Sequence, residues 1–369
     1  MINIIIISPI LILLLLILPN ILADIEISTS QAISSSLRIL SSNNDDQGNL
    51  PMIFILGVQK GGSSSLFEFL IEHPLLCGGQ HKEPHFFDHD HPNMPYAKKT
   101  RADYMKMFPT VDKCKSSSKS RYIDGTTLMY KLDVASDRMA AFYTSEEKDK
   151  LKFIVLVREP VSRDYSWYCQ VMRDKLGNGI RFSQIDTFLE ADAKRDTKER
   201  DKHIHRSGKY IEQLEHFVRN FRRDQLLVIS SQAVFQNSSA VMESVSGFLG
   251  IKKIDLWNGP FPHDDHLGKP DWQKIISCIV SHIPQFDCKS REELAEYYKP
   301  WNKALEHWME ATKNEASKWE PPFIPFGDSY KNIKCVASAR DEFNKLVLQN
   351  PKQISCLNPQ ISSKDKKES

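Results

Sequence analysis

The sequence has no surplus of charge of either sign, because 49 lysines and arginines stand against 47 aspartates and glutamates, a net charge of +2. Proteins that attract nucleic acid or an anionic membrane through their overall field carry a clear basic excess. The balance therefore argues against nucleic acid as a partner and requires any anion recognition to be local. With 41% hydrophobic and 26% charged residues, the composition is that of a globular protein that buries a substantial core.

The nucleotide-triphosphate loop is also missing. The nearest turn, Phe54 to Leu66, places Gly61 and Gly62 between an apolar run and the start of an amphipathic helix. The triphosphate loop requires Gly-x-x-x-x-Gly-Lys-Ser/Thr, whereas here Ser63 follows the glycine pair and Lys60 precedes it. Ordinary ATP or GTP chemistry is therefore disfavoured. A strand, a glycine turn and a helix start still direct several backbone N–H groups at one anion.

Charge is absent from the beginning of the chain as well. Residues 3–22 contain no charged residue and are nearly long enough to span a bilayer. Residues 21–23 offer a cleavage site before Asp24, but no Lys or Arg precedes the apolar run. Residues 1–23 are thus either a cleaved signal peptide or an uncleaved signal-anchor that holds the protein on the membrane. Both alternatives place the rest of the chain in the lumen of the secretory pathway.

The remaining organisation follows from composition. Residues 24–50 are rich in Ser, Asn and Asp without sustained periodicity, so we expect a disordered stem, followed by a folded domain over 51–330. Residues 331–369 form a C-terminal extension and tail. The sequon Asn237-Ser-Ser239 becomes meaningful in a lumen.

Seven cysteines are present, an odd number, so at least one should stay unpaired. Thiols can pair in an oxidising lumen. Cys278 and Cys288 lie close in sequence and could form a disulfide that closes a loop.

Short apolar runs alternate with segments of helical periodicity. Strands are expected at 52–58, 152–157 and 226–229, and helices at 63–73, 161–176, 210–221 and around 241–248. Such alternation predicts an α/β fold of three layers, α/β/α, with a mostly parallel sheet and a P-loop-like turn. Ligands of these sheets bind beyond the carboxyl ends of the strands, where the turns at Gly61 and Arg158 both fall. The two turns can therefore share one ligand.

Three segments, each at a strand end or just beyond one, carry a resemblance to a known family: 57–65, 82–88 and 157–168. Together they resemble the lumenal carbohydrate sulfotransferases, in particular the heparan sulfate 3-O- and N-sulfotransferase group and the related GalNAc 4-sulfate 6-O-sulfotransferase. The resemblance extends from about residue 52 to about residue 308. It implies a Golgi-lumenal enzyme, a single-pass type II membrane protein if the leader is uncleaved. The expected reaction moves a sulfuryl group from 3′-phosphoadenosine 5′-phosphosulfate (PAPS) to a glycan hydroxyl.

The resemblance assigns the donor site to the two turns. The first turn would hold the 5′-phosphosulfate, with Lys60 neutralising the leaving oxygen and with backbone and hydroxyl donors from Gly61, Gly62, Ser63, Ser64 and Ser65. In the second turn, Arg158 and Ser166 would bind the 3′-phosphate. The alternatives are a structural glycine turn with a solvated Lys60, and an Arg158 that merely pairs with Asp164.

The acceptor side is assigned to Lys82-Glu-Pro-His-Phe-Phe-Asp88. An attacking hydroxyl must lose its proton, and the resemblance makes Glu83 the general base, with His85 and Asp88 orienting it or the sugar. Glu83 could instead be an exposed loop carboxylate, and the other two residues could be structural. A metal bound by the histidines and aspartates of residues 81–91 is disfavoured, because their spacings suit no tetrahedral zinc site. We therefore expect no metal.

The sequence also departs from the family. The 3-O-sulfotransferases have a second lysine where residues 123–127 read Ile-Asp-Gly-Thr-Thr, and their Lys-Gly-Arg loop over the donor is not recognisable near 278–291. The first departure and the Lys82-Glu-Pro-His85 run favour an acceptor like the galactosaminoglycans or another sulfated polysaccharide. The alternatives are a protein-tyrosine sulfotransferase and a non-catalytic protein that binds sulfated glycan on the same fold.

Overall fold

The computed structural model describes residues 49–88, 95–115, 120–130, 133–177, 205–258 and 286–341. The predicted leader, nearly all of the predicted stem, the region around Cys278 and the tail beyond Asp341 lie outside the described residues. In the described ranges, no helix has both the length and the apolar composition that a membrane span requires.

A parallel sheet of five strands in the order β2-β3-β1-β4-β5 forms the centre of the fold. The strands are β1 (Pro51–Gly57), β2 (Leu76–Gly78), β3 (Arg121–Asp124), β4 (Lys152–Val157) and β5 (Leu226–Ser230). β1 pairs with β3 on one side and with β4 on the other, all in parallel register. The central position of β1 puts the loop after it between the loops that follow its neighbours.

Side chains of the central strands alternate between two apolar cores, one on each face of the sheet. In β1, Ile53 and Ile55 enter the core shared with helices α2 (Ser63–Ile71) and α11 (Ser238–Leu249). Phe54 and Leu56 enter the core shared with α4 (Asp133–Phe142) and α9 (Tyr210–Asn220). β4 and β5 alternate in the same way. A strand covered on both faces reads as a continuous apolar run, which explains why these three strands were predictable.

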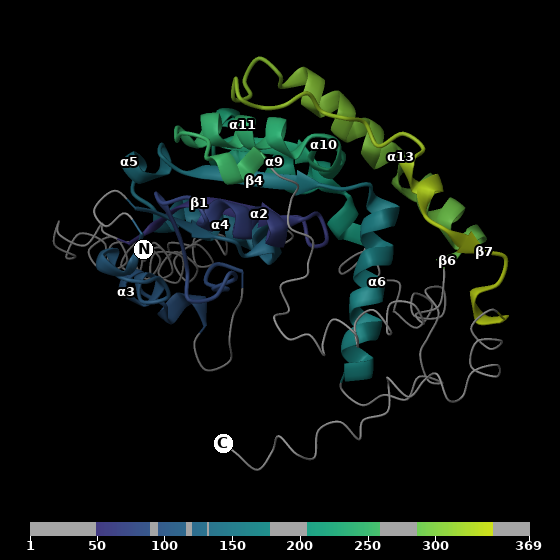
Figure 1. The fold of residues 1–369 in the computed structure, drawn as a ribbon, viewed down its shortest axis with the longest axis horizontal. Helices are drawn as coiled ribbons and strands as arrows, with labels where there is room; N and C mark the ends of the chain where they lie inside the picture. Colours follow the sequence, from purple (N-terminus) through teal and green to yellow (C-terminus); the bar gives the residue numbers. More distant parts are fainter. Residues whose placement is uncertain are drawn as a thin grey trace, which may run out of the picture. The chain divides into compact units, whose positions relative to one another are not determined.

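Helices cover both faces of the sheet, which confirms the predicted three-layer α/β/α class (Figure 1). The helices are α2 (Ser63–Ile71), α3 (Arg101–Met105), α4 (Asp133–Phe142), α5 (Ser145–Lys148), α6 (Pro160–Gly177), α9 (Tyr210–Asn220), α10 (Ser231–Gln236), α11 (Ser238–Leu249) and α13 (Cys288–Ala311). The predicted helices correspond to α2, α6, α9 and α11 within two residues at most ends. Strands β2 and β3 and the long helix α13 were not predicted.

A third apolar cluster joins α6 to α13 beside the sheet. It contains Val161, Tyr168 and Met172 of α6 together with Phe286 and Tyr298. The buried Tyr298 hydroxyl also donates a hydrogen bond to Asp164 Oδ2 at 2.6 Å. The cluster fixes α6 against α13 and against β6 (Phe286–Asp287) and β7 (Cys335–Val336), a pair of short parallel strands.

The described part of the chain holds two disulfides, Cys77–Cys114 and Cys288–Cys335. The predicted link between Cys278 and Cys288 is wrong, because Cys288 is already bonded to Cys335. The prediction rested on closeness in sequence, but the β6–β7 pairing brings Cys335 to the start of α13 across 47 residues. Cys169 has a free thiol, as the odd count requires of at least one cysteine.

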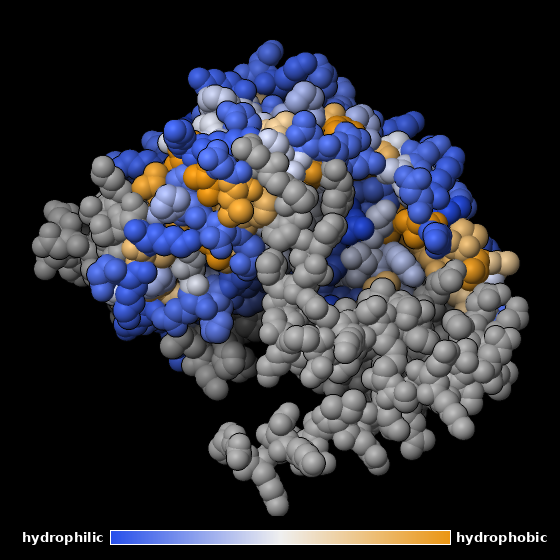
Figure 2. Space-filling view, viewed as in Figure 1, coloured by the Kyte–Doolittle hydropathy of each residue, from blue (hydrophilic) through white to orange (hydrophobic). Residues whose placement is uncertain are grey.

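Where Figure 2 is coloured by hydropathy, the surface is mostly hydrophilic and its apolar residues form separate patches. The exposed large hydrophobic side chains among the described residues are Val134, Leu256 and Trp319. They come from distant parts of the chain. The large hydrophobic side chains of the described residues are therefore used mainly for the three cores.

Candidate active site

The loop between β1 and α2 turns sharply at the carboxyl edge of the sheet. Gly62 has φ 101° and serves as the N-cap residue of α2. A Cβ on Gly61 would lie 2.5 Å from the carbonyl oxygen of Leu156 in β4, so only glycine permits this close approach. Ser231 Oγ donates a hydrogen bond to the Gly61 carbonyl at 2.6 Å. The loop is therefore packed against β4 and hydrogen-bonded to the first residue of α10.

The turn after β4 meets this loop directly. Arg158 Nη1 donates a hydrogen bond to the Lys60 carbonyl at 3.0 Å, and Lys60 Nζ donates one to Gln170 Oε1 of α6 at 3.1 Å. Burial lowers the pKa of Arg158, yet the ordinary value is so high that the guanidinium stays charged. Asp164, the alternative partner of Arg158, is paired with Arg163 instead. The two predicted donor turns are thus in contact.

Helix α6 starts in a way that fixes Arg158 at the strand end. Pro160 occupies the first helical position, where its missing N–H costs nothing. The buried carboxylate of Glu159 accepts hydrogen bonds from the backbone N–H groups of Val161 at 2.9 Å and Ser162 at 2.7 Å. The Tyr210 hydroxyl donates to the Arg158 carbonyl at 2.6 Å. The β1–α2 loop, the start of α6 and Tyr210 of α9 therefore together fix the position of Arg158.

A cavity of about 600 Å³ lies beside these turns. It is lined by Lys60, Arg158, Ser162, Tyr165, Ser166, Cys169, Gln170, Arg173, Ser329, Asn332, Ile333 and Lys334. Four of these described lining residues are basic and none is acidic, although the whole chain is nearly neutral. Positive charge is therefore concentrated at this cavity, as local anion recognition would require.

The structure brings three of the predicted donor residues, Lys60, Arg158 and Ser166, to this cavity. The other loop residues, Gly61, Gly62 and Ser63 to Ser65, are not among its lining residues. Of these, Ser64 is exposed, Ser65 is half-buried and Ser63 is buried. The three serines form the first turn of α2, and Ser63 contacts Lys82, the neighbour of Glu83.

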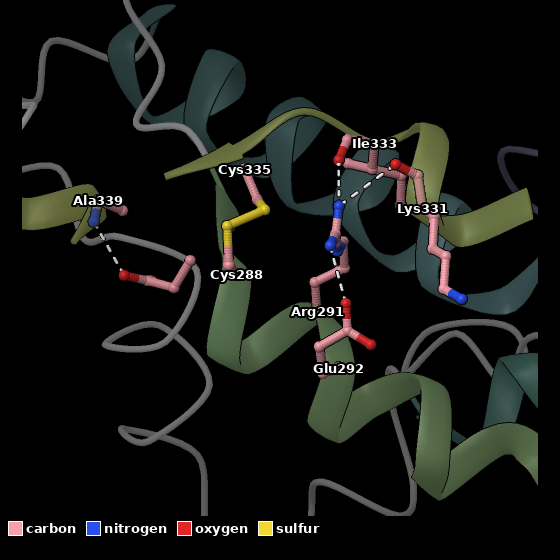
Figure 3. Close-up of a disulfide and its surroundings, with 8 residues drawn as sticks. Cys288, Arg291, Glu292, Lys331, Ile333, Cys335 and Ala339 are labelled. Atoms are coloured by element: carbon pink, nitrogen blue, oxygen red, sulfur yellow. Dashed lines mark hydrogen bonds and ion pairs between the residues drawn. A yellow bond between two sulfur atoms is a disulfide. The ribbon is translucent and has the colours of Figure 1, made fainter. Parts of the chain in front are cut away.

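One wall of the cavity comes from the segment Ser329 to Lys334, which is far from α6 in sequence and supplies Ser329, Asn332, Ile333 and Lys334. Figure 3 shows Ile333 of this wall near Arg291 and the Cys288–Cys335 disulfide. The Cys288–Cys335 disulfide ties the end of this wall to the start of α13. Arg291 Nη1 donates hydrogen bonds to the carbonyls of Ile333 at 2.9 Å and Lys331 at 3.3 Å. The wall is therefore clamped to α13 by one covalent bond and two hydrogen bonds.

Glu83 lies in a polar cluster on the other side of the β1–α2 loop. Its Oε1 atom is 2.8 Å from Lys82 Nζ and accepts a hydrogen bond from Thr127 Oγ1 at 3.2 Å. Its side chain is 28% exposed, so Glu83 is a partly buried and well-contacted carboxylate. Lys82 Nζ also donates to Ser63 Oγ at 3.5 Å. The cluster is thereby connected to the glycine loop.

His85 and Asp88 extend this cluster. His85 Nδ1 is 2.7 Å from Asp88 Oδ2, and His85 Nε2 is 3.6 Å from Glu83 Oε2. The hydrogen bond to Asp88 raises the pKa of His85, against the opposing effect of partial burial. Asp88 is buried, and its Oδ1 atom has no hydrogen-bond partner among the described residues. The three predicted acceptor-side residues therefore form one contiguous chain, Glu83–His85–Asp88.

The turn after β3 supports the segment that contains Glu83 and His85. Asp124 is fully buried, and its carboxylate accepts hydrogen bonds from Tyr104 Oη at 2.6 Å and from the Thr126 N–H at 2.8 Å. Burial raises the pKa of Asp124 to about 6. Thr126 Oγ1 in turn accepts from the His85 N–H at 3.3 Å. Residues 124–126, which contain no lysine, thus serve as the platform for residues 83–85.

Two non-glycine residues of the described chain have a left-handed backbone, Lys60 with φ 69° and His85 with φ 54°. This conformation costs roughly 1–2 kcal/mol for a residue with a Cβ. Such strain is most often found where a side chain must be held in a functional direction. Both residues belong to the set that the sequence selected.

A sulfotransferase domain model matches residues 50–326, which cover most of the chain. The chain belongs to the sulfotransferase family. The resemblance inferred from the three sequence segments is confirmed. The matched span includes both predicted donor turns and the Glu83 cluster.

Curated relatives of this sulfotransferase include heparan sulfate glucosamine 3-O-sulfotransferase 3A1 of Homo sapiens, 28% identical over 289 residues. The match covers 74% of this chain and 64% of that protein. Bifunctional heparan sulfate N-deacetylase/N-sulfotransferase 4 of Mus musculus is 24% identical over 289 residues, which cover 73% of this chain and 31% of that protein. The chain thus spans less than two thirds of the length of either relative.

Among solved structures, a sulfotransferase from Alicyclobacillus acidocaldarius has a TM-score of 0.51 and 23% identity. It covers 71% of this chain and 96% of that one. This likeness supports the fold.

Sequence reasoning missed several lining residues of this sulfotransferase. Ser162, Gln170 and Arg173 share with Ser166 the i, i+4, i+8 and i+11 spacing of one face of α6, a signal that helical periodicity could have shown. Lys334 and its neighbours had no such signal, since their place at the cavity depends on the β6–β7 pairing. The metal alternative includes His89, Asp90 and His91, which lie outside the described residues. Among the described residues, no group of three His, Cys, Asp or Glu side chains could hold a metal ion.

Proposed function

We propose that this protein transfers a sulfuryl group from PAPS to a hydroxyl of a glycan, a sulfated polysaccharide or a glycosaminoglycan-like chain. The observation that carries the proposal is the placement of the β1–α2 loop between two sites. Lys60, at one end of the loop, lines the basic cavity, while Ser63 contacts the lysine that is paired with Glu83. One loop therefore adjoins both an anion site and a candidate base.

The cavity suits the donor in size and charge. Pockets for ligands of this size are typically 300–1,000 Å³, and this one is about 600 Å³. Lys60, Arg158, Arg173 and Lys334 offer four positive charges to a donor with several negative ones. Arg158 and Ser166 would hold the 3′-phosphate, and Lys60 with the amides and hydroxyls of residues 61–65 would hold the 5′-phosphosulfate.

The reaction is an in-line displacement at sulfur. The acceptor oxygen forms a bond to sulfur while the bond from sulfur to the bridging phosphate oxygen breaks, and 3′-phosphoadenosine 5′-phosphate (PAP) leaves with that electron pair. The hydroxyl proton passes to Glu83, and Lys60 neutralises the charge that develops on the leaving oxygen. His85 and Asp88 orient Glu83 through the contacts of 3.6 and 2.7 Å. No metal takes part in this scheme.

The relatives' names support a glycan acceptor, since both of the relatives described above carry heparan sulfate in their names.

A lumenal location is supported by the disulfides Cys77–Cys114 and Cys288–Cys335, because disulfides form and persist in oxidising compartments. We propose the Golgi lumen, with residues 1–23 as the membrane address. The domain limits 51–330 and the extension 331–369 belong to the same proposal.

The direct test incubates the protein with sulfur-labelled PAPS and a panel of heparan and chondroitin chains, native and desulfated, together with a tyrosine-containing protein. Disaccharide and amino-acid analysis then locate the label. Label on a sugar hydroxyl supports the proposal. Label on tyrosine would favour a protein-tyrosine sulfotransferase. PAP binding without label on any acceptor would favour a non-catalytic protein that binds sulfated glycan.

Two variants test the residue roles. Lys60→Ala should abolish transfer and weaken PAP binding, because the side chain lines the donor cavity. Glu83→Gln should lower kcat by roughly 10²–10⁴-fold, the usual range for a general base, with PAP binding unchanged. Lys106→Met, a change at a side chain that is 76% exposed, is the matched control. Full turnover by the Glu83 variant would show that another group is the base.

A further inference from the structure

Lys82 links the candidate base to the donor loop. Its Nζ atom lies 2.8 Å from Glu83 Oε1 and 3.5 Å from Ser63 Oγ. The Lys82 side chain is 20% exposed, so the ion pair is largely shielded from water. The ammonium group therefore lies between the carboxylate and the first residue of α2.

The protein restricts where this lysine can lie. The Lys82 carbonyl accepts a hydrogen bond from the Gly125 N–H at 3.0 Å. A Cβ on Gly125 would be 3.0 Å from Lys82 Cγ, so the lysine stem runs directly over this glycine. Residues 123–127 themselves carry no lysine. A cation reaches this platform from the neighbouring loop instead.

We propose that Lys82 is a positioning residue for Glu83 that allows a carboxylate to stand beside an anionic donor. The proposal rests on the sulfuryl-transfer function proposed above. An unpaired Glu83 carboxylate would be repelled by a phosphosulfate held at the Ser63 loop, since like charges at short range oppose each other. Lys82 removes this repulsion and aims Oε1 by the 2.8 Å contact.

Lys82 and Lys60 thus have separate tasks. Lys60 bonds Gln170 and lines the nucleotide cavity, whereas Lys82 bonds Glu83 and is not among the described lining residues of that cavity. Loss of Lys82 should therefore affect turnover more than nucleotide affinity. Loss of Lys60 should affect both.

The experiment compares Lys82→Met with the wild-type protein in the transfer assay and in PAP binding by calorimetry. Methionine keeps the length of the stem without the charge. We expect kcat to fall about 100-fold, the size of loss that misplacing a reacting group by ~1 Å can cause, with PAP affinity changed less than about 3-fold. Lys82→Arg keeps the positive charge and should recover at least about a tenth of wild-type turnover.

A double variant separates positioning from a general structural effect. If Lys82 acts through Glu83, then Lys82→Met/Glu83→Gln should be less than about 3-fold slower than Glu83→Gln alone, because effects of contacting residues are not additive. Lys106→Met serves as the matched control, and thermal unfolding shows whether each variant is folded.

Several results would overturn the proposal. An active wild-type enzyme whose Lys82→Met variant keeps its kcat excludes the role of Lys82 and leaves the proposed function intact. Equal losses of kcat and PAP affinity would assign Lys82 to donor binding. An unfolded Lys82→Met protein together with an inactive Lys82→Arg variant would assign Lys82 to stability. Absence of transfer by the wild-type protein with every acceptor refutes the proposed function itself.

Discussion

The disulfide behind the cavity wall offers a sharp test, because the chain contains a second disulfide that can serve as its control. Replacing Cys288 and Cys335 with serine removes the covalent link between α13 and the wall, Ser329 to Lys334. Replacing Cys77 and Cys114 removes a link between β2 and the segment before β3. Neither Cys77 nor Cys114 lines the cavity.

Both double variants should lose similar stability. The cross-linked residues are 47 apart in one disulfide and 37 apart in the other. In the chain-entropy account, each cross-link of this length contributes about 4 kcal/mol to the free energy of unfolding. Chemical denaturation under non-reducing conditions measures this loss for each variant.

Nucleotide binding should separate the two variants. Without the bond at Cys335, about two adjoining residues of the wall must be ordered when the donor binds, at roughly 1 kcal/mol each. A cost of about 2 kcal/mol corresponds to roughly 30-fold weaker PAP binding. The two hydrogen bonds from Arg291 remain and keep the loss from being complete.

Calorimetric titration with PAP, at a temperature where both variants are folded, is the assay. We expect Cys288→Ser/Cys335→Ser to bind PAP roughly 30-fold more weakly, and Cys77→Ser/Cys114→Ser to bind within about 3-fold of the wild type. Equal PAP affinities in the two variants would refute the reasoning. They would show that the disulfide does not order the cavity wall.

Three further predictions concern the loop, the free thiol and the acceptor cluster. Gly61→Ala should weaken PAP binding at least about 10-fold, because its Cβ would lie 2.5 Å from the Leu156 carbonyl oxygen; unchanged calorimetric affinity would contradict this. Since burial raises the pKa of Cys169 to about 11, iodoacetamide should modify it slowly at pH 8 and more slowly with PAP, as mass spectrometry can follow; rapid modification would argue against its place in the cavity. Asp88→Asn should lower the pKa of His85 toward 6.5 in an NMR titration. Because folding raises the pKa of His85, the stabilisation of the fold by the His85–Asp88 contact is fully present below pH 6.5 and is lost as the pH rises through the raised pKa. Equal His85 titration curves in the wild type and the Asp88 variant would exclude the contact.

Much of the fold was predictable because it is encoded in short-range patterns. β1, β4 and β5 are continuous apolar runs, and α2, α9 and α11 show helical periodicity. β2 and β3 escaped prediction since they have three and four residues, too few for a periodic signal. The long α13 carries charged residues over much of its surface and buries few side chains, which weakens its apolar pattern.

The sequence by itself determined the family, the α/β class, the two donor turns and the candidates Lys60, Arg158, Ser166, Glu83, His85 and Asp88, because these depend on residue types at fixed local spacing. Only the tertiary structure decided that Arg158 bonds the Lys60 loop, that Lys82 bridges Ser63 and Glu83, and that Cys288 pairs with Cys335. Apart from the contact between the neighbours Lys82 and Glu83, these contacts join residues 19 to 98 positions apart. Such pairs are selected by how the strands and helices pack, and no local pattern in a single sequence records that choice.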